Sequence, residues 1–379
     1  MSEEPARLEK TRALFSKTLD AFARHPFHHH RFFGGGHAQT LAAFAWPRKH
    51  RFKSVRDEER IFETAPDVKV LGHCRWQPER LAHPTLIIWH GIEGSSASTY
   101  MFGTAEKAFR AGFNVIRMNL RTCGGTEHLT PTIYHGGLTD DLREVVKQLI
   151  EVDKLKQVLL AGFSLGGNMV LKLSGEYGDQ PPPEVLAVVA VSPSIDLAAS
   201  AELILKRSNW LYHRDFVYRL KKRVRTKRRL FPDRYDTRGL WKVWTLREFD
   251  DKFTSGAHGF TGADDYYHKA SSIRVIDRIR IPTMIIHAQD DPFIPFAPLT
   301  DPLVTNNPYI LLVGPERGGH VAFVSDDPAE TANPSAPADH SGLSTQDDSG
   351  LLTQDSPLFD RFWAENRLVE FCKLARDIE

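Results

Sequence analysis

Short apolar segments alternate with longer amphipathic segments from residue 85 onward, and this alternation constrains the fold more than any other feature of the chain. A short apolar run is typical of a strand that is buried on both faces, and amphipathic helices between such strands produce a parallel sheet. The stretches 98–111, which Gly112 would cap, and 139–151 are expected to be helices. Six apolar runs are expected to be strands: 85–90, 113–120, 157–163, 185–192, 283–288 and 309–314.

The remaining sequence divides the chain into parts. Residues 52–76 resemble a β-hairpin, which would add antiparallel strands to the start of a mostly parallel sheet. Between residues 194 and 273 the alternation stops, and Trp-, Tyr- and Arg-rich sequence with helical periodicity replaces it. We therefore expect an N-terminal extension (1–51), an α/β core with helices on both faces of its sheet (52–193 and 274–379), and an inserted helical cap (194–273).

The segment 325–357 differs in composition from the rest of the chain. It has no aromatic residue, no Lys and no Arg, and it carries seven acids among 33 residues. Such a segment cannot bury enough apolar surface to offset the entropy that it would lose on ordering, so a mobile surface loop is expected. A final amphipathic helix is expected from about Leu358 to Arg376.

The overall composition excludes several classes of protein. A net charge of +1 predicts no general attraction to nucleic acid. The three cysteines are far apart and fit no metal or redox spacing, which favours reduced thiols. The N-terminal residues lack the apolar core of a signal peptide, and no apolar run is long enough to span a bilayer. These features predict a cytoplasmic protein.

The sequence Gly-Phe-Ser-Leu-Gly at 162–166 is the strongest candidate for a catalytic motif. It ends a predicted strand and precedes helix-like sequence. A serine at a sharp strand-to-helix turn exposes its hydroxyl group, and the flanking glycines let neighbouring backbone approach closely. Ser164 is therefore the predicted nucleophile. A phosphate-binding loop is excluded because Asn168 and Met169 stand where Lys and Ser or Thr would be needed.

A serine hydroxyl needs a base to remove its proton and an acid to orient that base. In a parallel α/β fold with a serine at such a turn, the acid follows a later strand and the histidine follows the last strand. The strands expected at 283–288 and 309–314 therefore indicate Asp291 and His320. Asp290 is the alternative acid. We prefer Asp291 because it lies four residues before Pro295, as in a D-x-x-x-P turn.

A hydrolase of this type also needs two backbone donors for the oxyanion that forms on the substrate. Leu165, directly after the nucleophile, is the first candidate. Ile92, in the sequence HGIEGSS at 90–96, is the second, because this loop follows the strand expected at 85–90. Cys123 is expected to be a small buried residue near the pocket rather than a second nucleophile.

The histidine-rich segment 25–37 is not expected to bind metal. Adjacent histidines point in different directions on any regular element, and no carboxylates complete a ligand set. Its glycine triplet lies upstream of every predicted strand, so the segment is not expected to supply the oxyanion loop either. We expect neither a metal nor a cofactor.

Several motifs resemble those of YheT-type α/β-hydrolases, which are similar to plant embryo-abundant proteins and animal α/β-hydrolase-domain lipases. The resemblance covers about residues 32–324 and implies the α/β-hydrolase fold, a cap over a Ser-Asp-His site and hydrolysis of carboxylic esters, often of acyl lipids. Some members act as alcohol acyltransferases. The chain departs from the pattern in its 325–357 insertion and in Arg121-Thr122, where Arg-Gly is usual. The motifs are GGHAQT (35–40), HGIEGSS (90–96), NLRTCGG (119–125), YHGGLTDDLR (134–143), GFSLGGN (162–168), EFDD (248–251), DYY (265–267), DDPFIP (290–295) and GGHVAF (318–323).

These features together predict a serine hydrolase that cleaves small-molecule or lipid esters through an acyl-enzyme. An alcohol acyltransferase with the same residues, or a non-catalytic ligand-binding protein of the same fold, is the alternative. The sequence from Lys206 to Arg229 has eleven Lys or Arg and one acid beside several aromatic residues. It predicts either contact with an anionic membrane or a solvated basic helix face. The sequence does not indicate acyl-chain length, the alcohol part of the substrate or oligomeric state.

Overall fold

The computed structural model describes residues 4–46, 57–326 and 360–378. Its centre is an eight-stranded sheet in the order β1-β2-β4-β3-β5-β6-β7-β8. β2 pairs antiparallel with both β1 and β4, and the other neighbouring strands are parallel. The strands are β1 (Glu58–Ala65), β2 (Val68–Arg75), β3 (Thr85–Trp89), β4 (Asn114–Met118), β5 (Val158–Phe163), β6 (Val185–Val191), β7 (Thr283–Ile286) and β8 (Ile310–Val313).

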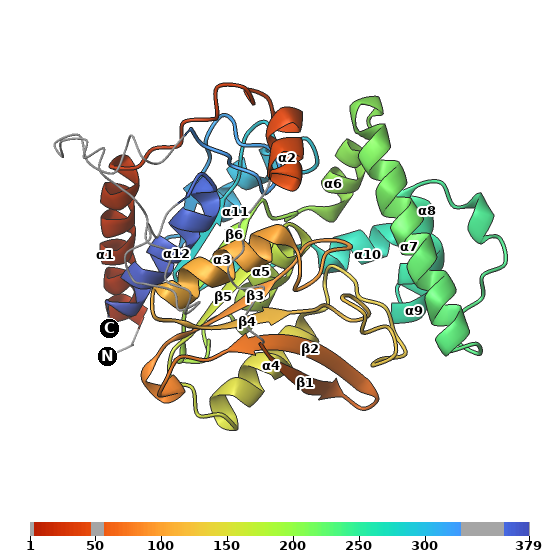
Figure 1. Cartoon of the computed structure of the whole chain (residues 1–379), viewed down its shortest axis with the longest axis horizontal. Coiled ribbons are helices and arrows are strands. Elements are labelled where there is room, and N and C mark those ends of the chain that lie inside the picture. The colour runs from red at the N-terminus through yellow and green to blue at the C-terminus, as the bar shows by residue number, and fades with distance from the viewer. Residues whose placement is uncertain (1–3, 47–56, 327–359, 379) are drawn as a thin grey trace, which may run out of the picture.

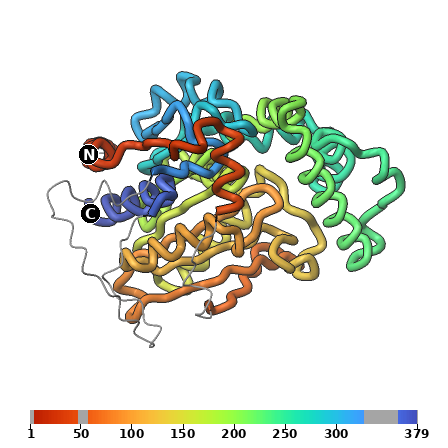
Figure 2. Tube along the Cα trace, turned by 45° about the horizontal axis from the view of Figure 1, so that its top comes forward, coloured from red at the N-terminus to blue at the C-terminus, as the bar shows by residue number. Residues whose placement is uncertain are grey.

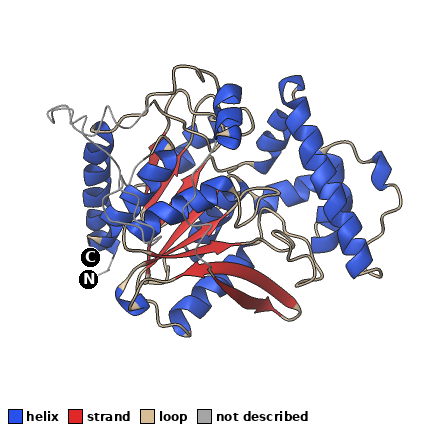
Figure 3. Ribbon diagram, in the orientation of Figure 1, coloured by secondary structure: helices blue, strands red, loops and turns tan. Residues whose placement is uncertain are grey.

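This sheet confirms the predicted α/β fold class. Each of the six apolar runs contains one parallel strand, and the expected hairpin is the β1–β2 pair. The observed strands are up to two residues shorter at an end than the apolar runs, since the residues at those ends belong to loops. Figure 3 shows the strands at the centre of the molecule with helices on both sides.

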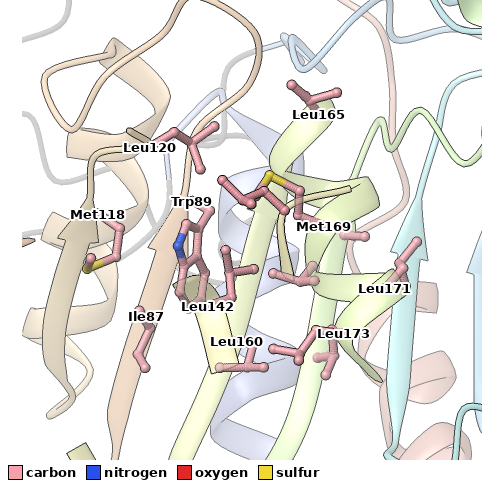
Figure 4. Close-up of a cluster of buried hydrophobic side chains, with 14 of the residues drawn as sticks. Ile87, Trp89, Met118, Leu120, Leu142, Leu160, Leu165, Met169, Leu171 and Leu173 are labelled. Atoms are coloured by element: carbon pink, nitrogen blue, oxygen red, sulfur yellow. The ribbon is translucent and has the colours of Figure 1, made fainter. Parts of the chain in front are cut away.

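Both faces of the sheet are covered because its strands are apolar on both faces. On β3, Ile87 and Trp89 point into one apolar cluster, whereas Leu86 and Ile88 point into the other. The first cluster packs against α4 (Thr139–Glu151) and α5 (Leu165–Tyr177), and Figure 4 shows its side chains from β3, β4, β5 and α5. The second packs against α1 (Glu4–Ala23), α3 (Thr99–Arg110) and α12 (Trp363–Arg376).

The chain between β6 and β7 forms a group of helices beside the sheet, green to cyan at the right of Figure 1. No strand is described between residues 194 and 273. Many of its apolar side chains form a separate cluster, which also includes Ile133, Phe293 and Ile294 of the core, and others join the cluster on one face of the sheet. We call this group the cap: α6 (Leu197–Ile204), α7 (Trp210–Leu230), α8 (Leu246–Phe249), a π-helical turn (Asp250–Thr254), α9 (Ser255–His258) and α10 (Ala263–Ala270).

The N-terminal residues pack on the core rather than extending away from it. In α1, Phe15 contacts Phe371 of α12 with ring centroids 6.4 Å apart. The chain then runs across the molecule to α2 (Gly36–Ala45), as the red segment in Figure 2 shows. The short helix α11 (Pro302–Thr305) precedes β8.

Most of the loop expected at 325–357 lies outside the described residues. Ser325 and Asp326 are described, and the Ser325 N–H donates a hydrogen bond of 2.8 Å to the carbonyl of Arg361. The residues on either side of the segment are therefore joined. Within the described residues, no helix has the length and apolar character needed to cross a membrane.

Candidate active site

Ser164 occupies the sharp turn between β5 and α5. Its backbone has φ 54° and ψ −117°, a conformation that residues other than glycine rarely adopt. Its N–H donates a hydrogen bond of 2.9 Å to the carbonyl of Val191 in β6, which holds the turn against the sheet. The turn presents the hydroxyl group at the carboxyl end of the parallel strands.

Three glycines make room for this turn. A Cβ atom on Gly162 would lie 2.2 Å from the carbonyl oxygen of Gly166, and one on Gly166 would lie 2.6 Å from that of His90. A Cβ atom on Gly91 would lie 2.9 Å from the Cβ atom of Ser164. Since each of these distances is shorter than real Cβ contacts, the turn and the neighbouring loop require glycine at all three positions.

His320 lies between Ser164 and Asp291. Its Nε2 atom is 3.0 Å from Ser164 Oγ, and its Nδ1 atom is 2.8 Å from Asp291 Oδ2. When Nδ1–H donates to the carboxylate, Nε2 is left to accept the proton of the serine hydroxyl. The structure thus brings together the three side chains that the sequence indicated as nucleophile, base and acid.

The Asp291 carboxylate is enclosed by protein. Its other oxygen, Oδ1, accepts hydrogen bonds from the backbone N–H of Phe293 at 2.8 Å and of Ile294 at 3.0 Å. Burial by itself would raise the pKa of Asp291, but the charge and hydrogen bond of His320 outweigh it and hold the pKa below its ordinary value. Asp291 is therefore ionised at neutral pH.

Asp290, the alternative acid, contacts the same loop at a different point. Its Oδ1 atom accepts the backbone N–H of Gly319 at 2.9 Å. Burial raises the pKa of Asp290 above its ordinary value. The two adjacent acids therefore have separate partners, the backbone before His320 for Asp290 and the imidazole for Asp291.

Residues 318–323, which we call the histidine loop, have an unusual backbone. Val321 and Phe323 have φ of 59° and 44°, and both glycines of the loop also have positive φ. A positive φ costs a residue with a Cβ atom roughly 1–2 kcal/mol, so contacts from outside must hold the loop in place.

Two hydroxyl groups from distant segments supply such contacts. Thr40 Oγ1 in α2 accepts the N–H of His320 at 2.9 Å, and Ser192 Oγ after β6 accepts the N–H of Val321 at 3.0 Å. The helix α2 comes this close because Gly36 packs on the backbone of Asp290, where a Cβ atom would lie 1.9 Å from the carbonyl oxygen. The sequence alone did not indicate a role for Thr40, Gly36 or Ser192. The motif GGHAQT, which contains Gly36 and Thr40, was the only sequence feature that could have pointed to the first two.

The predicted oxyanion donors, Ile92 and Leu165, line one cavity with Ser164 and His320. Among the described residues, neither of their backbone N–H groups has a hydrogen-bond acceptor. By contrast, the N–H groups on both sides of Ile92 donate to tyrosine hydroxyls, at 3.1 and 2.9 Å. The loop after β3 is thus fixed on both sides of an unused donor, as an oxyanion hole requires.

His90, which begins this loop, has a structural role. Its Nδ1 atom bonds to the carbonyl of Gly91 at 2.7 Å, and its Nε2 atom accepts the N–H of Leu120 at 3.1 Å. Burial lowers the pKa of His90 to about 4, so the ring is neutral. The histidine ties the loop to the end of β4.

An ion pair joins the cap to the same loop. Arg223 of α7 makes two hydrogen bonds to the carboxylate of Glu93, at 2.9 and 3.0 Å, and the two side chains are 9% and 5% exposed. Arg223 also donates to the carbonyl and the hydroxyl of Thr122. Thr122 has φ 64°, a conformation that favours glycine, and its hydroxyl gives Arg223 an additional acceptor.

The cavity lies between the core and the cap. The core contributes Ser164, His320 and apolar residues such as Phe293. The cap contributes mostly apolar side chains: Leu197, Ala201, Ile204, Phe216, Leu220, Leu246 and Phe249. Such a lining suits an acyl chain, because moving apolar surface out of water lowers the free energy of binding.

Two further features of the sequence have structural explanations. Cys123 is fully buried, and burial raises the pKa of its thiol to about 12, so the thiol remains protonated. In the described part of the chain, no three His, Cys, Asp or Glu side chains lie close enough together to bind a metal ion.

In the histidine-rich segment 25–37, the ring of His37 stacks on Tyr212 of the cap with centroids 5.9 Å apart.

Comparisons with known proteins agree with the fold of this chain. The family model described as alpha/beta hydrolase fold matches residues 84–327. "Putative esterase YheT" of Escherichia coli (strain K12) is 34% identical over 250 residues, which are 65% of this chain and 73% of that protein. "Phospholipase ABHD3" of Mus musculus is 29% identical over 242 residues, and the match covers 64% of this chain and 58% of that relative's length.

A solved structure has the same fold. The Pyrococcus furiosus esterase Pf2001 superposes with a TM-score of 0.50 at 18% sequence identity, covering 74% of this chain and 87% of the esterase chain. At this identity the likeness concerns the fold alone.

Proposed function

We propose that this chain, which belongs to the alpha/beta hydrolase family and to its YheT branch, is a carboxylic ester hydrolase. The observation that carries the proposal is the hydrogen-bonded series from Ser164 through His320 to Asp291 at the edge of an apolar cavity. The names of the relatives, an esterase and a phospholipase, are consistent with small-molecule or lipid esters as substrates.

In the proposed first half-reaction, Ser164 Oγ attacks the carbonyl carbon of the ester while His320 Nε2 takes the hydroxyl proton. The negative charge that develops on the carbonyl oxygen is stabilised by the N–H groups of Ile92 and Leu165. The bond between the carbonyl carbon and the alcohol oxygen then breaks. His320 returns its proton to the departing alcohol, which leaves an acyl group on Ser164.

In the second half-reaction, a water molecule attacks the acyl-enzyme and gives its proton to His320. The bond between the acyl carbon and Ser164 breaks, the serine recovers the proton and the carboxylic acid leaves. Asp291 stabilises the imidazolium in both halves and keeps the ring in the required tautomer.

The test combines labelling and turnover. The wild-type protein should react with a fluorophosphonate probe at Ser164 and hydrolyse a series of p-nitrophenyl esters, and Ser164→Ala should do neither. The chain-length optimum of that series measures how much acyl chain the cavity accepts. Adding an alcohol and analysing the products measures transfer to acceptors other than water. A wild-type protein that neither reacts with the probe nor hydrolyses any ester would contradict the proposal.

We also propose that the cap contacts an anionic membrane surface. Not all of its bases can do so, because Arg223 and Lys227 point inward, the first to Glu93 and the second to the carbonyl groups of residues 127 and 130. The exposed bases of α7 lie with three exposed tryptophans on the cap. We call this set the basic cap surface: Arg214, Arg219, Lys222, Arg225, Arg228, Arg229, Trp210, Trp241 and Trp244.

Exposed aromatic rings beside basic groups are typical of surfaces that lie at a lipid headgroup layer. Arg214 stands 4.5 Å from the ring centroid of Trp210, and Lys221 stands 5.3 Å from that of Trp244. Each tryptophan side chain is more than half exposed, at 53% for Trp210, 68% for Trp241 and 70% for Trp244. These contacts support a surface on which apolar and basic groups act together.

A further inference from the structure

Asp250 is an acid of the cavity that the proposed reaction does not use. It lies in the cap, at the start of the π-helical turn Asp250–Thr254, and lines the same cavity as Ser164 and His320. A π-helical turn is an uncommon backbone form that occurs frequently at functional sites. Because most of the cap side chains around the cavity are apolar, a carboxylate there is a distinct chemical feature.

The carboxylate of Asp250 is held by two hydroxyl groups. Thr254 Oγ1 donates to Oδ1 at 2.7 Å, and Tyr267 Oη donates to Oδ2 at 2.8 Å. None of the ion pairs found among the described residues involves Asp250, whereas the nearby acids Asp264 and Asp265 pair with Arg247 and Lys269. Burial raises the pKa of Asp250 to about 6. The carboxylate is therefore oriented by neutral groups and keeps lone pairs for a further donor.

A short series of contacts connects this acid to the nucleophile. A Cβ atom on Gly136 would lie 2.7 Å from the side chain of Leu165, the residue after Ser164. The hydroxyl of Tyr266 accepts the N–H of Gly136 at 2.9 Å, and the ring of Tyr266 lies 5.2 Å from that of Tyr267, which holds Asp250. Asp250 and Ser164 line this cavity from the cap and from the core, so one bound ester could contact both side chains.

We propose that Asp250 accepts a hydrogen bond from a hydroxyl group of the substrate. The preferred substrates are then esters with a free hydroxyl group, such as monoacyl esters of a polyol, rather than plain alkyl esters. The Thr254 and Tyr267 hydroxyls donate their hydrogen bonds to Asp250. Their oxygens can therefore accept a hydrogen bond from a ligand, but these groups have no further hydrogen to donate. This arrangement favours a neutral donor and disfavours an anionic group. The inference rests on the proposed ester hydrolase function.

The test uses two esters that differ in one group. The 2-hydroxyethyl and propyl esters of one fatty acid have the same acyl chain and nearly the same size, and only the first carries a hydroxyl group. The wild-type kcat/KM should favour the hydroxyethyl ester by about 10- to 100-fold, the range for a hydrogen bond to a charged group. Asp250→Ala should reduce this preference at least tenfold through the hydroxyethyl ester alone, and Asp250→Asn should reduce it less.

The matched control is Asp251→Asn. Asp251 is an exposed neighbouring acid whose Oδ1 accepts the N–H of Ala263, and it does not line the cavity. The control should keep the wild-type preference and the wild-type rate of fluorophosphonate labelling, and labelling of Ser164 in each Asp250 variant shows whether the nucleophile is still reactive. An unchanged preference in Asp250→Ala, or an equal loss on both esters, would overturn the inference.

Two further outcomes are informative. If Asp250→Ala does not fold, Asp250→Asn decides, and a preference identical to wild type in that variant overturns the inference. If the wild-type protein neither labels with the probe nor hydrolyses either ester, the proposed function itself fails. A protein that labels and hydrolyses both esters equally well retains the function and loses the hydroxyl subsite.

Discussion

The core and the cap contribute to the site by different physical means. The core positions its residues through backbone geometry: a strained turn for Ser164, a loop of positive φ around His320 and hydrogen bonds from backbone N–H groups to Asp291. The cap approaches the same cavity with side chains, which are mostly apolar apart from a few groups such as Arg223 and Asp250.

In the proposed function, this difference separates the reaction from the choice of substrate. Strained backbone conformations persist only where surrounding structure holds them, so the core geometry tolerates little change. Side chains on a helical insertion can be exchanged without altering the sheet, so the cap can accept a different substrate while the chemistry stays the same. Variants in the two regions should therefore fail in different ways.

The largest expected effect concerns the core. Ser164→Ala or His320→Ala should lower kcat/KM for a p-nitrophenyl ester by about 10⁴- to 10⁶-fold, because the first change removes the proposed nucleophile and the second removes the base that activates it. Both proteins should keep the wild-type circular dichroism spectrum and unfolding midpoint. Near-native turnover in either variant would remove that residue from the mechanism.

The next effect separates the two adjacent acids. Asp291→Asn should lower kcat by about 10³- to 10⁴-fold, since the imidazole loses the carboxylate that orients and stabilises it. Asp290→Asn should lower kcat by about tenfold or less, because the amide oxygen of Asn can still accept the N–H of Gly319. Steady-state kinetics of the two folded proteins gives the comparison. A larger loss for Asp290→Asn would reverse the assignment.

Breaking the Arg223–Glu93 ion pair between cap and core should lower both the stability of the protein and the rate of hydrolysis. Arg223→Met leaves the carboxylate of Glu93 buried without its cation, which costs about 3–5 kcal/mol in the free energy of unfolding. The loop that carries Ile92 should loosen, and kcat/KM should fall by about 10- to 100-fold. Urea unfolding and ester kinetics measure the two effects.

A matched variant and a double variant test this interpretation. Arg219→Met removes an exposed partner of Asp215 on the same helix and should cost less than about 1 kcal/mol. Adding Glu93→Gln to Arg223→Met should restore much of the lost stability, because no unpaired charge then remains buried. Equal losses in Arg219→Met and Arg223→Met would contradict the role of the buried pair.

A smaller effect is expected at the basic cap surface. Removing four exposed bases from α7 should weaken sedimentation with anionic liposomes, by up to about 1 kcal/mol per base at low salt, and leave hydrolysis of a dispersed ester within about twofold of wild type. The variant changes these residues to Ser: Lys222, Arg225, Arg228 and Arg229. Liposome binding that does not depend on the fraction of anionic lipid would contradict the proposed contact between the cap and a membrane.

The control for this variant carries the same loss of charge on α1 and on the residue directly after it. It changes four exposed bases to Ser: Lys10, Arg12, Lys17 and Arg24. Because these positions lie away from the cap, liposome binding should stay close to wild type. A comparable loss of binding in the control would show that net charge, and not the basic cap surface, attracts the membrane.

The smallest expected effect is a pH-dependent gain in stability. Because burial raises the pKa of Asp250 to about 6, its charged form destabilises the folded protein above that pH and has no such effect below the ordinary pKa of about 4. Asp250→Asn should therefore be more stable than wild type by about 1–3 kcal/mol at pH 8 and close to it at pH 4. Thermal unfolding of the variant and of the wild type at both pH values measures the difference.

Part of the site could be predicted because its signals are local. The Gly-Phe-Ser-Leu-Gly motif specifies a turn between a strand and a helix within five residues, and the structure has that turn at Ser164. Asp290 and Asp291 could not be separated with the same certainty, because adjacent residues share the same local sequence. Which of them faces the imidazole depends on how the loop after β7 meets the histidine loop.

Other contributors to the site have no local signal at all. Thr40 lies 280 residues from His320 in the sequence, and Arg223 lies 130 residues from Glu93, yet each pair is hydrogen-bonded. A count of bases between Lys206 and Arg229 likewise treats Arg223 and Lys227 as part of one charged surface. In the structure both point inward, because a buried carboxylate and backbone carbonyl groups lie beneath that side of α7.

By itself the sequence determined the sheet and the strand-to-helix turn at Ser164, because apolar periodicity and the conformational freedom of glycine act over a few residues and do not depend on distant neighbours. Tertiary structure decided which acid meets His320, which hydroxyls hold the histidine loop, which bases face solvent and that Asp250 lines the cavity. Each of these depends on long-range packing, in which partners far apart in sequence are brought together only when the apolar faces of strands and helices are buried.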